Sequence, residues 1–458
     1  MNLSFKNFKK EFYSKFTDYK IFEGKEFNYF KIALEGLKVD YLQNGKFSIS
    51  IFYPNFTYYI FYFTNRFKKI INGEISRFNS HLEISKTNKS PEYLIIDPGR
   101  AVKNSEGDLI PIYFSKIYES LKKYHSVFYV SEKSIPNYDG FNDTYSDLIS
   151  LGNSIKHSFS HSLRVEIKEV FTSINNNSNF SSKDLNNIKC AFQKFYNEAI
   201  FWLNILESLE PENILMICHY HKEGLIFAAK KLNINIIEYQ HGLIAKSDIF
   251  YNFPHEVKEI KKDCLFPNEI RTYGRYWKNI LINGNFINED NVKITEYFLY
   301  SRLKLNSNEL NFIDLFRKKR KIILITTQTY LTDIFVKYID SLLEILEDDY
   351  CVIIKPHPLE KTQLYNKYIE LDSVFLTDLP TEVLFLYASI HITMYSTTAF
   401  DALRYDLSSY YIYSENQSDY INEIHNAIGG EIIYDFNLKP WEIENKIKVN
   451  LDEFFYQK

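Results

Sequence analysis

The sequence of 458 residues is poor in glycine, proline and cysteine. Its 14 glycines and 12 prolines are too few for a fibrous or loop-dominated protein. The four cysteines are widely spaced and form no Cys-X-X-Cys pair, which argues against a disulfide framework and against a zinc site. We therefore expect a protein of the reducing cytoplasm that holds no metal.

An excess of basic residues and an apolar leader are also missing. The 54 Lys and Arg residues are offset by 58 Asp and Glu residues, a net charge of -4, so a nucleic-acid partner is not expected. Residues 1–10 are polar and basic with no apolar run behind them, unlike a secretion signal. Residues 51–63 are too short for a membrane span and are interpreted as a strand or a buried edge. Basic clusters such as residues 317–321 leave peripheral association with the inner face of the membrane open.

What is present is the composition of a globular protein, with 45% hydrophobic and 24% charged residues. The chain is too long for one ordinary core, so two domains are expected. Short apolar strands alternate with helices in two series, which predicts an α/β protein with parallel sheets covered on both faces. The first series has strands at 214–218 and 234–239 around a helix at 223–232. The second has strands at 322–326, 351–354, 374–376 and 390–393, with helices at 334–346, 381–388 and 399–405.

Outside the two series the pattern is less regular. We place the domain boundary near residue 300, which gives domains of residues 1–300 and 301–458. Residues 1–90 are expected to form an irregular cap of strands and short helices, because aromatic and polar positions alternate there. The other expected elements are strands at 93–96 and 126–130, helices at 117–124 and 188–209, a polar loop at 173–187, a mostly helical stretch at 279–320 and a closing helix at 441–455.

The first candidate site is Tyr239-Gln240-His241-Gly242, directly after a predicted strand. Ligands bind beyond the carboxyl ends of the strands in open parallel sheets. Gly242 would allow close backbone approach or a positive φ, His241 can exchange a proton near neutral pH, and Gln240 offers a donor and an acceptor. The alternative is an ordinary strand-to-loop turn with a structural histidine.

The second candidate site is Lys355-Pro356-His357-Pro358, after the strand at 351–354. The prolines fix φ and hold His357 in one pose, and a stiff loop that carries Lys355 and His357 suits a phosphate. The alternative is a proline-capped strand end.

The third candidate site is Tyr395-Ser396-Thr397-Thr398, which precedes the helix at 399–405. Hydroxyls and free backbone N–H groups at the start of a helix favour an anion. Serine and threonine are also ordinary N-caps, so this motif alone could be purely structural.

Two carboxylates are candidates for the catalytic base, Asp97 at a strand end and Glu223 beside His219 and His221. Asp97 could equally be a turn residue next to Pro-Gly, and Glu223 a charge at a helix start. The alternating histidines His219 and His221 could share an ion on an extended segment, but no Asp or Cys at ligand spacing joins them. We expect no metal here.

Together these motifs resemble a known family. The segments at 238–242, 355–358 and 395–403 occur in the order found in bacterial surface-polysaccharide transferases of the GT-B type, supported by residues 267–277 and 324–328. That family includes capsule Kdo transferases, polysialyl- and nonulosonate transferases and, more distantly, CDP-glycerol glycerophosphotransferases. The resemblance covers residues 213–413.

The resemblance implies two Rossmann-like domains facing across a cleft, and a transfer that needs neither metal nor cofactor. It assigns His357, Pro358, Ser396 and Thr397 to the donor nucleotide and its phosphate, and it turns the Gln-His-Gly segment towards the cleft. Asp401 stands where many relatives have Glu. The closing helix is expected to cross back to the first domain. The full set of expected donor-binding residues is Gln240, Gly242, Lys355, His357, Pro358, Tyr395, Ser396, Thr397 and Asp401.

The resulting hypothesis is a glycosyltransferase of capsule or lipopolysaccharide biosynthesis. It would transfer an acidic sugar, Kdo or a nonulosonic acid, from a CMP donor to a glycan or lipid-linked glycan acceptor. Asp97, His241 or Glu223 would assist deprotonation of the acceptor hydroxyl. A CDP-polyol or UDP-sugar donor is the alternative within the fold, and a non-catalytic glycan-binding component is the alternative of another class.

Overall fold

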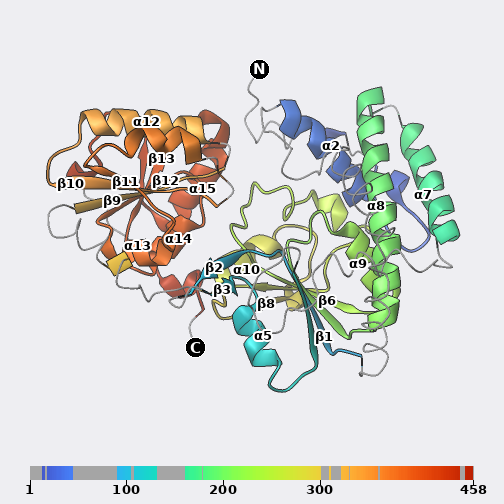
Figure 1. The fold of residues 1–458 in the computed structure, drawn as a ribbon. Coiled ribbons are helices and arrows are strands. Elements are labelled where there is room, and N and C mark those ends of the chain that lie inside the picture. The colour runs from blue at the N-terminus through green and yellow to red at the C-terminus, as the bar shows by residue number, and fades with distance from the viewer. Residues whose placement is uncertain are drawn as a thin grey trace, which may run out of the picture.

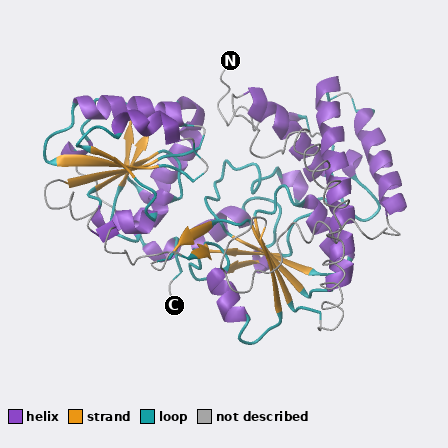
Figure 2. Cartoon of the chain, viewed as in Figure 1, coloured by secondary structure: helices purple, strands orange, loops and turns teal. Residues whose placement is uncertain are grey.

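Two parallel sheets, each flanked by helices, organise the chain (Figures 1 and 2). The first sheet uses strands between Tyr93 and Ile294, and the second begins at Lys321. The computed structural model describes residues 13–15, 18–44, 90–104, 108–131, 160–177, 179–300, 309–310, 321–329, 331–358, 360, 362–443 and 449–456.

The first sheet has six strands, and every neighbouring pair is parallel. Its central strands are continuous apolar runs buried on both faces, as in β5, where Ile214 to Ile217 are all buried. A two-stranded antiparallel ribbon of β2 (Ala101–Lys103) and β3 (Leu109–Pro111) follows β1. In spatial order the sheet consists of β4 (Val127–Ser131), β1 (Tyr93–Asp97), β5 (Asn213–Ile217), β6 (Asn235–Tyr239), β7 (Glu269–Thr272) and β8 (Val292–Ile294).

The second sheet also has six parallel strands, and its central strand order reverses beside β9. The buried apolar run in β10 again indicates a strand covered on both faces. In spatial order the sheet consists of β11 (Val374–Leu376), β10 (Tyr350–Lys355), β9 (Lys321–Thr326), β12 (Ile390–Thr393), β13 (Ser409–Ile412) and β14 (Glu431–Ile433).

Helices cover these sheets and add a further layer to the first. The helices are α2 (Phe30–Asn44), α5 (Ser115–Leu121), α7 (Ser160–Asn175), α8 (Ser182–Leu209), α9 (Glu223–Lys231), α10 (Arg275–Ile282), α12 (Thr332–Glu344), α13 (Thr381–Tyr387), α14 (Thr398–Leu403) and α15 (Ser418–Ile428). Short 3-10 segments lie at Tyr19–Phe22, His255–Val257, Glu289–Asn291, Thr362–Tyr368, Glu415–Gln417, Pro440–Glu442 and Leu451–Glu453. No helix in the described ranges is long and apolar enough to cross a membrane.

This architecture confirms the predicted class, an α/β protein with two Rossmann-like domains built on parallel sheets. Hydrophobic periodicity located the strands of both series to within about two residues. One hydrophobic core includes side chains from both sheets, such as Ile237 in β6 and Ile325 in β9, so apolar packing is continuous between the domains.

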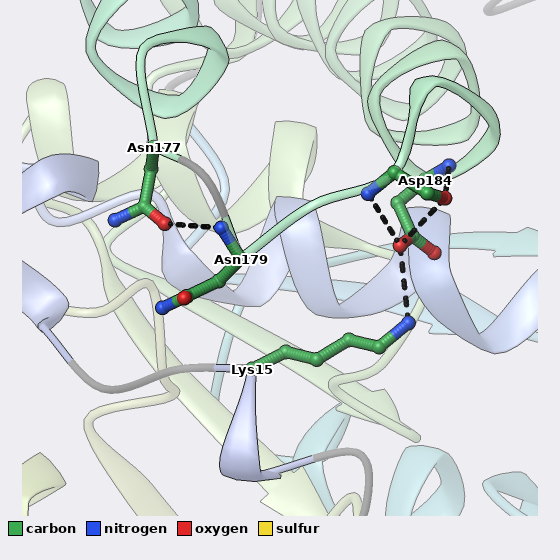
Figure 3. Close-up of polar contacts among 5 residues, drawn as sticks. Lys15, Asn177, Asn179 and Asp184 are labelled. Atoms are coloured by element: carbon green, nitrogen blue, oxygen red, sulfur yellow. Dashed lines mark hydrogen bonds and ion pairs between the residues drawn. The ribbon is translucent and has the colours of Figure 1, made fainter.

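The polar loop expected at 173–187 is wrong. Helix α7 continues to Asn175 and α8 already begins at Ser182. A capping box between Ser181 and Asp184 satisfies the first N–H groups of α8, and Lys15 forms an ion pair with Asp184 at 3.0 Å (Figure 3). The short connection is held by Asn179 N–H, which donates to Asn177 Oδ1 at 2.9 Å (Figure 3). The polar composition of residues 173–187 thus belongs to the end of one helix and the start of the next.

The irregular amino-terminal cap is also wrong for the described residues. There α2 is a 15-residue helix that packs on α8, with α7 beside it (Figure 1). Aromatic side chains fill the interface, as where the Tyr29 and Phe195 rings meet at 5.6 Å. The strand expected at 51–63 lies outside the described residues.

For the described residues, the closing helix and most of the helical stretch expected at 279–320 are likewise wrong. Helix α10 ends at Ile282, and between there and residue 300 coil, the 3-10 segment Glu289–Asn291 and β8 replace the expected helix, while 301–308 and 311–320 lie outside the described residues. The tail contains two 3-10 segments, yet it does return to the first domain as expected. Trp277 Nε1–H donates to the carbonyl of Phe454 at 3.0 Å, and the N–H of Tyr456 donates to the carbonyl of Tyr273 at 2.6 Å.

Candidate functional site

The carboxyl ends of both sheets contribute loops that contact each other. A Cβ atom placed on Gly242, after β6, would lie 3.9 Å from Thr397 Cγ2, after β12. The Gln-His-Gly turn of the first domain therefore faces the Tyr-Ser-Thr-Thr loop of the second. Gly242 does not have a positive φ, so of the two uses of glycine expected here, a positive φ or close backbone approach, the structure excludes the first. A Cβ there would meet only ordinary contact distances.

Gln240 holds the turn together from inside. Its side chain is 1% exposed, its Oε1 accepts from Tyr273 N–H at 3.0 Å, and its Nε2 donates to the carbonyl of Gly242 at 2.9 Å. The Tyr273 hydroxyl also donates to the backbone carbonyl of Gln240 at 2.6 Å. Both ends of the amide are thus used within the protein, so Gln240 shapes the turn, and its expected role in donor binding stays a prediction.

His241 is the reactive side chain of this turn. Its Nε2 lies 3.1 Å from the Tyr220 hydroxyl, while its buried Nδ1 finds no hydrogen-bond partner among the described residues. Burial lowers the pKa of His241 to about 4, against the opposing effect of the Glu238 carboxylate, and the Arg100 guanidinium lowers it further. The imidazole is therefore neutral at pH 7 and has one unsatisfied nitrogen.

Behind the turn lies a buried network that the sequence reasoning did not identify. His219 Nδ1 lies 2.8 Å from Glu238 Oε2, and the Tyr251 hydroxyl donates to Glu238 Oε1 at 2.7 Å. His219 and Glu238 are both fully buried. His221 points elsewhere, with its Nδ1 2.7 Å from Glu35 Oε2. The alternating histidines therefore serve separate carboxylates, because positive φ values at Cys218 and His221 break the extended backbone.

His357 is the counterpart of His241 in the second domain. Its Nδ1 lies 2.8 Å from Thr329 Oγ1, which follows β9. Burial lowers the pKa of His357 to about 4, and the neighbouring charges of Arg100 and Lys355 lower it further. His357 is thus also a neutral imidazole, surrounded by cations.

Glu360 fixes the loop that carries His357, and no sequence motif identified it. It accepts hydrogen bonds from the Tyr365 hydroxyl at 2.7 Å, from Thr332 Oγ1 at 2.5 Å and from Thr327 Oγ1. The backbone N–H of His357 donates to the same carboxylate at 3.3 Å. The loop is therefore stiffened by a carboxylate hub as well as by its prolines.

Lys355 ends β10 at the base of this loop. Burial lowers its pKa, and the carboxylates of Asp378 and Glu382 oppose that shift. Pro358 is exposed at the far end of the loop. The Lys-Pro-His-Pro loop thus combines a half-buried cation, a neutral histidine and an exposed proline at one sheet edge.

The Tyr-Ser-Thr-Thr loop is tied to the neighbouring strand end. Gln328, after β9, accepts from the N–H of Tyr395 at 3.0 Å. Ser396 Oγ accepts from the N–H of Thr398 at 3.2 Å, and Thr397 precedes α14 without capping it through its side chain. Tyr395, Ser396 and Thr397 are half-buried and lie on the side of the second domain that meets Gly242.

Asp401 connects the domains. Its Oδ1 accepts from the Tyr297 hydroxyl at 3.0 Å. Burial raises the pKa of Asp401 to about 7, with a smaller effect of the Glu382 carboxylate in the same direction. Arg404 stacks on the Tyr297 ring at 4.1 Å. The observed contact of Asp401 is thus with the first domain, just after the Tyr-Ser-Thr-Thr loop in the sequence.

Arg100 is the site residue that the sequence reasoning missed. It follows Asp97-Pro98-Gly99, where Gly99 has a φ of 73° that a residue with a side chain rarely adopts. This turn sends the exposed Arg100 side chain to Tyr113, whose hydroxyl accepts from Nη1 at 3.2 Å. The Arg100 charge depresses the pKa of His241 and of His357. A strand-end Pro-Gly-Arg was the available signal.

The two candidate carboxylate bases are held within the first domain. Asp97 is fully buried, with the Tyr129 hydroxyl donating to Oδ2 at 2.7 Å and the N–H of Gly99 donating to Oδ1 at 2.6 Å. Glu223 lies 3.3 Å from the buried ammonium of Lys31 and lines a small cavity between α2, α8 and α9. Neither contact set brings a carboxylate to the loops of the second domain, which favours the structural alternative for both residues.

No protein-family model and no curated protein matches this chain. Similar solved structures include a variant of the wall teichoic acid polymerase TagF soaked with CDPG, at 14% identity and a TM-score of 0.39 over 82% of this chain and 85% of that chain. A UDP-GlcNAc 2-epimerase from Methanocaldococcus jannaschii aligns at 15% identity and a TM-score of 0.43, over 79% and 96% of the two chains. The S. aureus MnaA–UDP co-structure aligns at 12% identity and a TM-score of 0.42, over 71% and 80%. Likenesses this distant carry no information on substrate or reaction.

Proposed function

We propose that this protein is a glycosyltransferase that binds a nucleotide-sugar donor between its two domains. The observation that carries the proposal is the approach of strand-end loops from the two sheets, where a Cβ on Gly242 would lie 3.9 Å from Thr397 Cγ2. The charge of Arg100, which lowers the pKa of both His241 and His357, adds a cation to this region. A donor phosphate is the group that such an environment attracts.

The surroundings of the two histidines support an anionic ligand. Arg100 and Lys355 are cations, and both imidazoles are neutral with a pKa of about 4. A neutral imidazole beside a cation gains when an anion binds, since the anion stabilises the protonated form. The unsatisfied Nδ1 of His241 is a further polar atom, whose partner the hydroxyl of an acceptor would supply.

In the proposed reaction the bond between the sugar and the leaving phosphate breaks while an acceptor hydroxyl attacks the anomeric carbon. Lys355, His357 and the hydroxyls of Ser396 and Thr397 would stabilise the charge that develops on the departing phosphate. His241 would take the acceptor proton on Nδ1, in the tautomer whose Nε2–H donates to Tyr220. Because Asp97 and Glu223 are engaged elsewhere, His241 is the base that we favour among the three candidates.

For the donor we propose a CMP-linked acidic sugar, Kdo or a nonulosonic acid, with transfer to a glycan or lipid-linked glycan of a bacterial surface polysaccharide. The support is the order of the Gln-His-Gly, Lys-Pro-His-Pro and Tyr-Ser-Thr-Thr motifs along the chain. A CDP-polyol and a UDP-sugar are the other donors to be compared. The proposed reaction uses no metal and no cofactor.

Thermal unfolding with CMP, CDP or UDP tests the proposal directly. We expect one nucleotide to raise the Tm of the wild-type protein. Arg100→Ala and His357→Ala should each raise the Kd of that nucleotide roughly ten-fold or more. The reason is that each removes a polar side chain proposed to contact the charged phosphate. The matched controls are Arg275→Ala and His255→Ala, whose side chains are 69% and 73% exposed and lie in other segments.

The outcomes separate the possible functions. Stabilisation by CMP alone supports the acidic-sugar donor, and stabilisation by CDP or UDP replaces it with one of the alternatives. If no nucleotide stabilises the wild-type protein, the transferase proposal fails and a glycan-binding component takes its place. If Arg100→Ala responds like Arg275→Ala, the shared anion site is refuted.

A further inference from the structure

Helix α15 of the second domain contacts the loops on both sides of the proposed donor site. It lies on the side of its domain that faces the first domain (Figure 1). Near its start, the Tyr420 ring stacks on the ring of Tyr395 with centroids 5.4 Å apart and planes 27° from parallel. One side chain of α15 thus rests on the Tyr-Ser-Thr-Thr loop.

One turn further along the helix, Glu423 reaches the first domain. Its Oε1 accepts from the backbone N–H of Lys246 at 2.6 Å. Its Oε2 lies 3.4 Å from the N–H and 3.5 Å from the hydroxyl of Ser247. A carboxylate that accepts from consecutive backbone N–H groups is a directional contact that a long, flexible ion pair does not provide.

The bound segment is the loop that follows His241-Gly242. Within the first domain this loop is closed by Asn252, whose Nδ2 donates to the carbonyl of Ala245 at 2.7 Å. Glu423 holds the side of the loop that faces the second domain. The two domains are thereby fastened a few residues after the turn that carries the unsatisfied imidazole of His241.

We propose that Glu423 is a positioning residue: by fastening Lys246 and Ser247 to α15, it fixes the Gln-His-Gly turn opposite the Tyr-Ser-Thr-Thr loop. Its role in transfer rests on the function proposed above, whereas the fastening itself does not. Tyr420 of the same helix packs on Tyr395, so α15 holds the Gln-His-Gly turn and the Tyr-Ser-Thr-Thr loop in a fixed relative position. The acceptor and the donor are then aligned only while this contact is made.

Hydrogen exchange at backbone amides tests the fastening without any ligand. In Glu423→Ala we expect the amides of the 243–252 loop to exchange roughly ten-fold faster or more, because hydrogen bonds to a charged group are lost. Glu423→Gln keeps one acceptor oxygen and should fall between the alanine variant and the wild type. Asn422→Ala, at an exposed position on the same helix, is the matched control and should match the wild type. Equal exchange in Glu423→Ala and Asn422→Ala overturns the proposal.

Transfer kinetics test the positioning role. With the nucleotide donor that stabilises the wild-type protein, Glu423→Ala should lose roughly ten-fold in kcat while the Kd of the nucleotide alone changes by less than about two-fold. Glu423→Gln should recover part of kcat, and Asn422→Ala should leave it unchanged. A faster-exchanging loop with unchanged kcat refutes the positioning role. If no nucleotide binds the wild type, the proposed function fails and positioning for transfer fails with it, while the exchange result still decides whether Glu423 fastens the loop.

Discussion

The strand-end loops of the two sheets use similar residues in different ways. In the first domain, Asp97 and Gln240 are buried and their polar atoms are engaged inside the protein. In the second domain, other residues make most of the corresponding internal bonds, and Ser396 Oγ accepts only the N–H of Thr398 among the bonds found within its own loop. Glu360 and Gln328 hold the two loops from below, so that Lys355 and Ser396 remain only half-buried at the sheet edge.

The difference shows what decides whether a strand-end polar residue can act on a ligand. In both sheets the sequence indicates a ligand-binding residue in the same way, by a polar residue at the carboxyl end of a strand. A side chain that supplies the hydrogen bonds of its own turn has no polar atom left for a ligand. A side chain whose turn is held by a neighbouring residue has polar atoms that remain available to a ligand. The first domain accordingly offers His241 and Arg100, and its remaining motif residues build the turns that aim them.

The largest effect that we expect from this comparison is that of Gln240→Ala. Removing the amide leaves the N–H of Tyr273 and the carbonyl of Gly242 unpaired in the interior. We expect the free energy of unfolding to fall by about 3 kcal/mol, measured by urea denaturation. The control Gln193→Ala, exposed on α8, should change it by less than about 0.5 kcal/mol. A stable Gln240→Ala protein with weakened nucleotide binding would instead place Gln240 among the ligand-binding residues.

Buried histidines sharpen the comparison between the domains through pH. His219 of the first domain is paired with the carboxylate of Glu238, whereas the ring nitrogens of His391 in the second lie beside two hydroxyls, Thr326 Oγ1 at 2.8 Å and Ser409 Oγ at 2.7 Å. Burial lowers the pKa of His391 to about 3. The unfolded chain, with an ordinary histidine pKa of about 6.5, therefore binds more protons between these values. The contribution of His391 to the free energy of unfolding is therefore complete above about pH 6.5 and is lost as the pH falls towards 3.

We expect His391 to account for about 2 kcal/mol of the stability lost between pH 7 and pH 5. Urea denaturation at the two pH values measures this loss. In His391→Gln the loss should be smaller by that amount, whatever the substitution costs at pH 7. His255→Ala, at an exposed histidine of the first domain, is the matched control for the loss of a histidine. Equal losses in the wild type and in His391→Gln would show that His391 is protonated in the folded state at pH 5.

How far sequence predicted this molecule depends on how local the deciding contacts are. The strands of both series follow from short apolar runs, because a strand buried on both faces must be apolar along its length. The polar run at 173–187 was misjudged, since a capping box made by Ser181 and Asp184 starts a helix there, and the few apolar residues of the run, such as Ile174 and Phe180, are buried in the core.

The candidate site divides along the same line. Lys355, His357 and Ser396 were recognisable because their motifs are contiguous. Arg100 and Glu360 were not, because Arg100 donates to Tyr113 and Glu360 accepts from Thr327 and Thr332, residues of other segments that no local motif indicates. The burial of Asp97 and Gln240 was equally invisible, since only the packed structure shows which side of a strand end is filled.

The smallest expected effect on stability, and the most specific one on binding, comes from Gly242 of the first domain, with Gly224 of the same domain as the contrast. A Cβ on Gly224 would lie 2.7 Å from the backbone nitrogen of Ala199, so Gly224→Ala must displace α8. A Cβ on Gly242 would meet only Thr397 Cγ2, at 3.9 Å, and its φ is not positive. Gly242→Ala should therefore change the free energy of unfolding by less than about 0.5 kcal/mol, in contrast to Gly224→Ala.

Nothing in the polypeptide requires glycine at position 242, so a requirement for it must come from a ligand. If the donor occupies the space between the Gln-His-Gly turn and the Tyr-Ser-Thr-Thr loop, Gly242→Ala will weaken the stabilising nucleotide or its sugar conjugate while the protein itself stays as stable as the wild type. Titration calorimetry of both variants and of the wild type measures this. Unchanged affinity for both ligands would show that the donor does not lie against Gly242, and the facing loops would then have to be assigned to the acceptor.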